Sequence, residues 1–148
     1  MITKILVGYD GSEASGRALR LGCDIATKYR AKIEVSHTPK DETVSYAAEA
    51  ISGFYIGPNV ARDETLLAAA EKMADKARAI AADCGHQGLE VHIGHGNPAE
   101  DLLARAKSDG VDLIVTGRRG LGDLRGLLLG STSHGISAKA ECAVLTVA

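Results

Sequence analysis

The chain has 148 residues, of which 45% are hydrophobic, 24% charged and 3% aromatic, with a net charge of −2 and no tryptophan. This balance is typical of a globular protein with a sizeable buried core, and we expect a single domain over residues 1–148. The small negative charge and scarce aromatic rings argue against nucleic acid as a partner, because its backbone draws cationic patches and its bases draw stacking rings.

The first half of the sequence alternates between strand and helix patterns. The apolar run 4–10 predicts a buried strand, and Ser12 can cap the helix that follows it. The alternating segment 31–37 predicts a second strand. Residues 38–63 hold several glycines and prolines and are interpreted as a loop, after which small and apolar residues at helical spacing predict a helix over 64–84.

The second half continues the same alternation. Three further strands are predicted from their apolar patterns, at residues 89–93, 111–117 and 143–148. Asn97 and Pro98 suit the cap and first turn of a helix, and Gly110 suits its end. A weaker helix is predicted over residues 130–140.

Five strands separated by helices predict a doubly wound α/β fold, a five-stranded parallel sheet with helices on both faces. Strands covered on both faces have continuous apolar runs, whereas partly exposed strands alternate. The first and fourth strands are continuous and the third alternates, which favours the strand order 3-2-1-4-5. In this order ligands bind beyond the carboxyl ends of the first and fourth strands, where Asp10 and Gly117 stand.

A glycine-rich segment leaves the fourth strand at this point. Gly117 and Gly120 are followed by Gly130 and Ser131 at the predicted start of a helix. Glycines let backbone N–H groups approach anionic oxygens, and a helix N-terminus attracts anions. The sequence contains no GxxxxGK[ST] P-loop. The segment therefore predicts a polyphosphate site of another kind.

The spacing Gly117-x2-Gly120-x9-Gly130-Ser131, between strands that read VTG and VLTV, resembles the ATP-binding signature of the universal stress protein family. The opening KILVGYDGSEAS and the turn at residues 96–98 are similar to that family as well, so the resemblance covers essentially the whole chain. It implies an adenine nucleotide alpha hydrolase-like fold, ATP and Mg²⁺ as ligands, and a homodimer that pairs through the last strand. Ala143 departs from the proline that often follows the cysteine before that strand.

The resemblance also implies roles for single residues. Asp10 would lie beside the ribose and the metal-bound phosphates, and it is the one residue implied near Mg²⁺. Thr38 would offer backbone atoms to the adenine. The ribose and the phosphates would be lined by Thr116, Gly117, Arg119, Gly120, Gly130, Ser131, Thr132 and Ser133.

Several functions remain open. The leading interpretation is a nucleotide-dependent regulator of stress response or signalling, and the alternatives are a nucleotide-independent dimeric scaffold, a slow ATPase, or an enzyme such as an adenylyl transferase on a related scaffold. No catalytic residue is assigned, because Asp123 lies in mid-loop and His134, in the first turn of the last helix, is the one candidate base. The alternative for Asp10 is a plain turn residue, and the alternative for the glycine segment is a connector.

The sequence also bears on the cellular location of the protein and on the redox state of its cysteines. No apolar run approaches the roughly 18 residues of a membrane span, and the first residues lack a signal-peptide pattern, so we expect a cytoplasmic protein that does not bind membranes. Cys23, Cys84 and Cys142 are far apart in the sequence and form no CxxC motif. We interpret them as buried thiols of a reducing compartment.

Overall fold

The computed structural model describes residues 1–39, 60–121 and 129–148, with side chains of 60–63 left aside. Its elements follow the predicted alternation of strands and helices. They are β1 (Lys4–Gly8), α1 (Glu13–Tyr29), β2 (Lys32–His37), α3 (Val60–Asp83), β3 (Glu90–Ile93), α4 (Pro98–Asp109), β4 (Leu113–Gly117), α5 (Ser131–Lys139) and β5 (Ala143–Val147).

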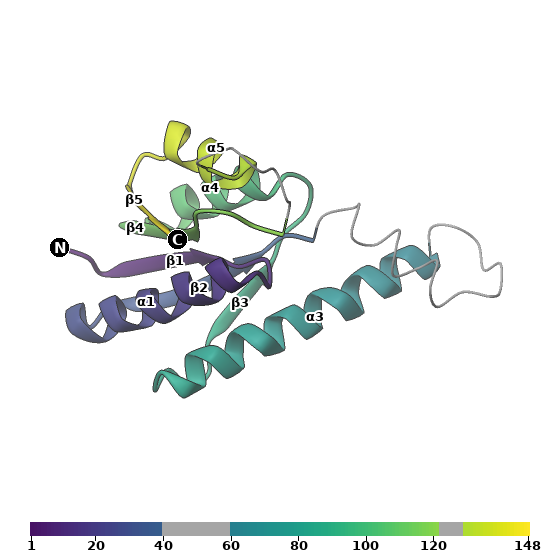
Figure 1. The fold of residues 1–148 in the computed structure, drawn as a ribbon, viewed down its shortest axis with the longest axis horizontal. Coiled ribbons are helices and arrows are strands. Elements are labelled where there is room, and N and C mark those ends of the chain that lie inside the picture. The colour runs from purple at the N-terminus through teal and green to yellow at the C-terminus, as the bar shows by residue number, and fades with distance from the viewer. Residues whose placement is uncertain (40–59, 122–128) are drawn as a thin grey trace.

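The five strands form one parallel sheet in the order β3-β2-β1-β4-β5, which confirms the predicted fold class and strand order. β1 lies at the centre, where Ile5 pairs with Ile33 of β2 and with Leu113 of β4. Helices α1 and α3 cover one face of the sheet, and α4 and α5 cover the other (Figure 1). Within the described residues, no helix is both long and apolar enough to cross a membrane.

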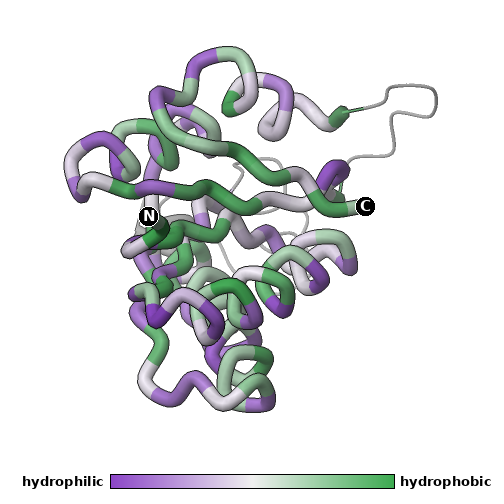
Figure 2. The backbone as a smooth tube through the Cα atoms, turned by 90° about the vertical axis from the view of Figure 1, so that its left-hand side faces the viewer, coloured by the Kyte–Doolittle hydropathy of each residue, from purple (hydrophilic) through white to green (hydrophobic). Residues whose placement is uncertain are grey.

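The central strands contribute to two hydrophobic cores because their side chains alternate between faces. Ile5 and Val7 pack with α1 and α3, whereas Leu6 and Ile114 pack with α4 and α5. All four side chains are fully buried. Continuous apolar runs in β1 and β4 therefore mean burial on both faces, and Figure 2 shows the helices that cover them alternating between polar and apolar stretches.

The predicted helix boundaries are confirmed where a cap was recognised. Ser12 Oγ accepts a hydrogen bond from Ser15 N at 3.2 Å, and Asn97 Oδ1 accepts from the N–H groups of Ala99 and Glu100. The third helix differs, because α3 begins at Val60, inside the segment interpreted as a loop. Pro58 is the last glycine or proline of the segment interpreted as a loop, so residues 60–63 include neither of the residues that oppose a helix most strongly.

At the amino end of the sheet a buried carboxylate is surrounded by cations. The Glu34 side chain is 3% exposed and lies 3.3 Å from Lys4 Nζ, 2.9 Å from Lys32 Nζ and 3.3 Å from Arg105 Nη2. Burial by itself raises the pKa of Glu34, but hydrogen bonds from the three cations outweigh it and lower the pKa to about 2. This end of the sheet therefore holds a closed network of paired charges.

Candidate functional site

The predicted site residues gather at the carboxyl ends of three neighbouring strands. Gly8 of β1 pairs with Ser36 of β2 and with Thr116 of β4, so the three strands end at the same level. Asp10 follows β1, Thr38 follows β2, and Gly117 ends β4. Strand order and register thus place the segments that sequence spacing had assigned to one site around the switch point.

Asp10 joins the turn after β1 to the glycine segment after β4. Its Oδ1 accepts a hydrogen bond from Ser12 N at 2.9 Å, the turn role considered as an alternative. Its Oδ2 accepts from Leu121 N at 3.3 Å, across the site. A Cβ at Gly120 would collide with this oxygen, so glycine is required there by the approach of the carboxylate.

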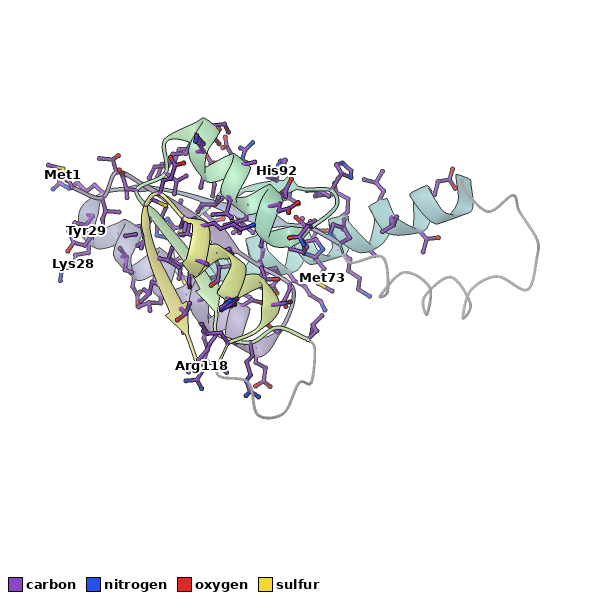
Figure 3. All side chains as sticks on the ribbon, turned by 90° about the horizontal axis from the view of Figure 1, so that it is seen from above. Met1, Lys28, Tyr29, Met73, His92 and Arg118 are labelled. Carbon is purple, nitrogen blue, oxygen red and sulfur yellow. The ribbon has the colours of Figure 1, made fainter. Side chains whose placement is uncertain are left out.

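The two ends of the glycine segment are held by hydrogen bonds. Gly130 N donates to Arg118 O at 2.8 Å, and Ser133 Oγ donates to Gly117 O at 2.6 Å. Arg118 N donates in turn to Val147 O of β5 at 2.6 Å. In Figure 3 Arg118 lies at the end of the sheet where β5 finishes. Both described ends of the segment are therefore anchored beside the strand ends.

The glycines of this segment have different reasons to be glycine. A Cβ at Gly117 would lie 2.9 Å from Ala14 Cβ and from Ser15 N, so helix α1 excludes a side chain there. A Cβ at Gly130 would have its nearest described neighbours at 3.6 Å, an ordinary contact, and its φ of −67° suits any residue. Packing of the described protein atoms therefore does not require glycine at Gly130.

The start of α5 presents backbone N–H groups without a side-chain cap. Gly130 is the N-cap and supplies no side-chain cap, so the first-turn N–H groups of α5 have no side-chain partner from the cap. Nearby, Thr116 Oγ1 is buried and has no hydrogen-bond partner among the described residues. Helix N-termini carry a partial positive charge and attract anions. The arrangement suits a ligand with anionic oxygens.

Other side chains at the site were not recognised from the sequence. Met73 of α3 packs over Gly11, whose φ is +84°, with its Sδ 2.7 Å from the position a Cβ would take. His37 Nδ1 donates to Tyr9 O at 2.8 Å, since a carbonyl oxygen can only accept. Met73 is one of the apolar residues at helical spacing that predict the helix over 64–84, and no local motif indicates that this helix reaches the site.

A carboxylate of α4 holds the end of β2. Asp101 Oδ2 accepts hydrogen bonds from Thr38 Oγ1 at 3.2 Å and from Ser36 Oγ at 3.4 Å, and lies 3.5 Å from His92 Nε2. A Cβ at Gly94 would collide with the same oxygen. The Thr38 side chain is therefore engaged by α4, which leaves its backbone for any contact with a ligand.

Groups of both charge signs lie near the site. Burial, and then the neighbouring Asp10 carboxylate, raise the pKa of Tyr9 above its usual value. The side chains of Arg118, Arg119 and His134 are exposed at the surface. Asp123, which the sequence places in mid-loop, lies outside the described residues.

The comparisons with known proteins agree with this fold. The model of the universal stress protein family matches residues 1–148. The universal stress protein YxiE of Bacillus subtilis is 33% identical over 150 aligned residues, which cover 99% of each chain. The structure of the universal stress protein UspA from Lactobacillus plantarum has a TM-score of 0.78 and 24% identity, covering 99% of this chain and 98% of its own.

Two further solved structures share the fold and contain a nucleotide. One is a universal stress protein in complex with cAMP, with a TM-score of 0.69 and 24% identity, covering 99% of this chain and 97% of its own. The other is a universal stress protein from Archaeoglobus fulgidus in complex with dAMP, with a TM-score of 0.65, 21% identity and complete coverage of both chains. With its whole length matched by the family model and by a relative at 33% identity, this chain belongs to the universal stress protein family.

Proposed function

We propose that this protein binds ATP with Mg²⁺ at the carboxyl ends of β1 and β4, and that nucleotide occupancy regulates a stress response. The observation that carries the proposal is Gly130. The packing of the described residues would allow a side chain at Gly130. Its absence leaves the N-terminus of α5 accessible to a ligand. A phosphate chain against that N-terminus explains the glycine, because a side chain would occupy the space of an oxygen.

The residues implied for ATP fit such a ligand. The phosphates would be held by the backbone N–H groups of α5's first turn at Ser131, Thr132 and Ser133. Ser133 would bind through its backbone, since its hydroxyl already donates to Gly117 O. Gly117, Arg119 and Gly120 would line the ribose and phosphate side, together with Thr116, whose unpaired Oγ1 is a ready donor.

Asp10 suits a role beside the metal ion. Mg²⁺ in nucleotide sites is commonly held by one or two carboxylates together with phosphate oxygens. Asp10 supplies such a carboxylate between β1 and the glycine segment. Bound Mg²⁺ would neutralise phosphate charge. The adenine would meet the backbone of Thr38, and the cAMP and dAMP bound by two structural relatives support an adenine base.

The proposed site is built for binding more than for turnover. His134, the candidate base, is exposed, and its backbone N–H belongs to the first turn of α5, donating to Gly130 O. An exposed imidazole is poorly placed to orient a water for in-line attack. We expect phosphate release under saturating Mg-ATP far below the ~10 s⁻¹ typical of enzymes. Turnover at that rate, lost in His134→Ala, would make the protein an ATPase.

The dimer is proposed through β5. This strand lies at the edge of the sheet, and its side chains from Val144 to Val147 are only partly covered. An apolar edge strand favours pairing with another strand, and two-fold pairing removes both edges. Sedimentation should show a dimer at micromolar concentration, and Val144→Lys with Val147→Lys should shift it toward monomer while circular dichroism reports the fold. A monomeric wild type would contradict the proposal.

Titration calorimetry with Mg-ATP tests the binding site directly. Gly130→Ala should keep the fold, because its Cβ meets only ordinary contacts, but should weaken ATP binding by about 100-fold, the loss of two good hydrogen bonds to charged groups. Gly130→Val should abolish binding. The control Gly16→Ala in α1 meets only Ile80 Cδ1, at 3.8 Å, and should bind ATP like the wild type.

Two outcomes would overturn the proposal. Equal ATP affinity in wild type, Gly130→Ala and Gly130→Val would place any nucleotide elsewhere. A wild type that binds no adenine nucleotide, yet sediments as a dimer, would favour the nucleotide-independent scaffold.

A further inference from the structure

Two cysteines distant in the sequence meet on the face of the sheet opposite α4 and α5. Cys23 lies within α1 and is 1% exposed, while Cys84 directly follows α3 and is partly exposed. Cys84 packs against the core cluster that contains Cys23, and the two thiols are near enough that Cys84 contributes to the raised pKa of Cys23. The expectation that all three cysteines are buried therefore holds only for Cys23.

The backbone around this pair is held in place from both sides. Gly85 N donates to Ala82 O and His86 N donates to Ala81 O, the pattern of a Schellman motif that fixes Cys84 as the C-cap of α3. His86 Nε2 then lies 3.1 Å from Cys23 O, which ties the turn after Cys84 to α1. The two cysteines thus lie at an anchored junction between α1 and the end of α3.

Small residues allow the two helices to approach closely at this junction. Ala26 of α1 and both Ala77 and Ala81 of α3 are buried, at most 1% exposed, in the same core cluster. A disulfide requires Cα atoms about 4.4–6.8 Å apart, a spacing that small side chains permit between packed helices. Figure 1 shows α1 and α3 on the same face of the sheet.

The two thiols differ in reactivity. Cys84 is partly exposed, and Arg20 Nη1 donates a hydrogen bond to its Sγ at 3.9 Å. Burial first, and then the neighbouring Cys84, raise the pKa of Cys23 to about 12, so Cys23 stays protonated. Cys84 is thus the accessible thiol that meets an oxidant, and Cys23 is the resolving partner behind it.

We propose that Cys23 and Cys84 form a peroxide-sensitive thiol pair, which closes to an intramolecular disulfide between α1 and the end of α3. The Cys84 thiolate attacks hydrogen peroxide, the O–O bond breaks, and a sulfenic acid and hydroxide form. Cys23 sulfur then attacks Cys84 sulfur, the S–O bond breaks, and the Cys23 proton and the departing hydroxide leave as water. Two thiols become one disulfide while one peroxide becomes two waters.

This site is independent of the nucleotide. The disulfide would close a loop of about 60 residues, which restricts the unfolded chain strongly. We therefore expect oxidation to raise the melting temperature by about 10 °C and a reductant to reverse the rise. The pair would make the stability of the protein respond to peroxide.

The test treats the reduced full-length protein with hydrogen peroxide and maps its peptides without reduction. We expect Cys23 linked to Cys84 within one chain, with the reversible rise in melting temperature. Cys142→Ser is the matched control, because Cys142 packs in the core on the other face of the sheet, and it should behave like the wild type. In the Cys84→Ser variant, peroxide treatment should leave Cys23 reduced and should not change the melting temperature.

Other products would overturn the proposal. They are Cys84 carried to sulfinic acid while Cys23 remains a free thiol, a Cys84 linkage between two chains, or no oxidation of either thiol at peroxide levels that oxidise free cysteine. Since the wild-type map identifies each product directly, the result does not depend on any variant folding.

Discussion

The two ends of the sheet differ in how their polar groups are paired. At the amino end, Glu34 is surrounded by three cations, and the Asp112 carboxylate accepts hydrogen bonds from Thr3 N, Thr3 Oγ1 and Lys4 N. At the carboxyl end, Thr116 Oγ1 is buried without a described partner, and α5 begins without a side-chain cap. At the amino end Arg105 Nε makes no hydrogen bond with the described residues, but it lies 3.2 Å from Asp109 Oδ2 and so keeps an ionic partner. The Thr116 hydroxyl has no such partner among the described residues, and we assign it to a ligand.

The direction of the chain explains this division. In a parallel α/β sheet the helices run back against the strands, so helix N-termini gather at the carboxyl ends of the strands. Their N–H groups need partners there. Helix C-termini lie at the opposite end, where the last turns of α4 bring Asp109 to Lys4 and Arg105 to Glu34. The paired charges at one end and the proposed binding site at the other follow from the same topology.

The largest effect should come from breaking the amino-end network. Glu34→Gln removes the buried negative charge and leaves Lys4, Lys32 and Arg105 partly unpaired, which should cost about 3 kcal/mol in the free energy of unfolding. Glu90→Gln is the control, because Glu90 is 63% exposed and shares only Lys32, so its loss should cost under about 0.5 kcal/mol.

Urea denaturation at neutral pH measures both variants. A Glu34→Gln protein as stable as Glu90→Gln would mean that the network contributes little and that the contrast between the two ends is wrong. ATP affinity should be unchanged in both, since neither residue approaches the proposed site.

Acid should weaken the same network. The folded pKa of Glu34 is about 2, below the usual 4.5, so its stabilisation is fully present above pH 4.5 and is lost as pH falls toward 2. Between pH 7 and pH 3 the wild type should lose about 2 kcal/mol through this group. Glu34→Gln should lose less over the same range, so the two stabilities should converge in acid. Denaturation curves that stay parallel would contradict this assignment.

The smallest change in stability, and the clearest contrast, should come from the carboxyl end. Thr116→Val keeps the shape of the side chain and removes the unpaired hydroxyl, so the protein without ligand should be equally stable or more stable by up to about 1 kcal/mol. Its affinity for Mg-ATP should fall about tenfold through the lost hydrogen bond.

Thermal denaturation with and without Mg-ATP measures both effects in one experiment. A variant that is destabilised by 2 kcal/mol or more without ligand would show that Thr116 Oγ1 has a structural partner, and the hydroxyl would no longer indicate a binding site.

Much of the fold could be predicted because it depends on local patterns. The caps at Ser12 and Asn97 and the left-handed end at Gly110 stand where the sequence predicts them, since each satisfies helix ends within a few residues. The strand order followed from which strands were continuously apolar. The start of α3 was missed because its first residues follow a loop signal without carrying one themselves.

The sequence by itself determined the fold class and the strand order, because periodicity, caps and turn residues act over short stretches of chain. Only the tertiary structure decided which distant side chains meet. Met73 over Gly11, Asp101 on Thr38 and Cys84 against Cys23 each join elements far apart in the sequence. Such contacts depend on register and helix packing, where a shift of one residue turns a strand's side chain to the other face.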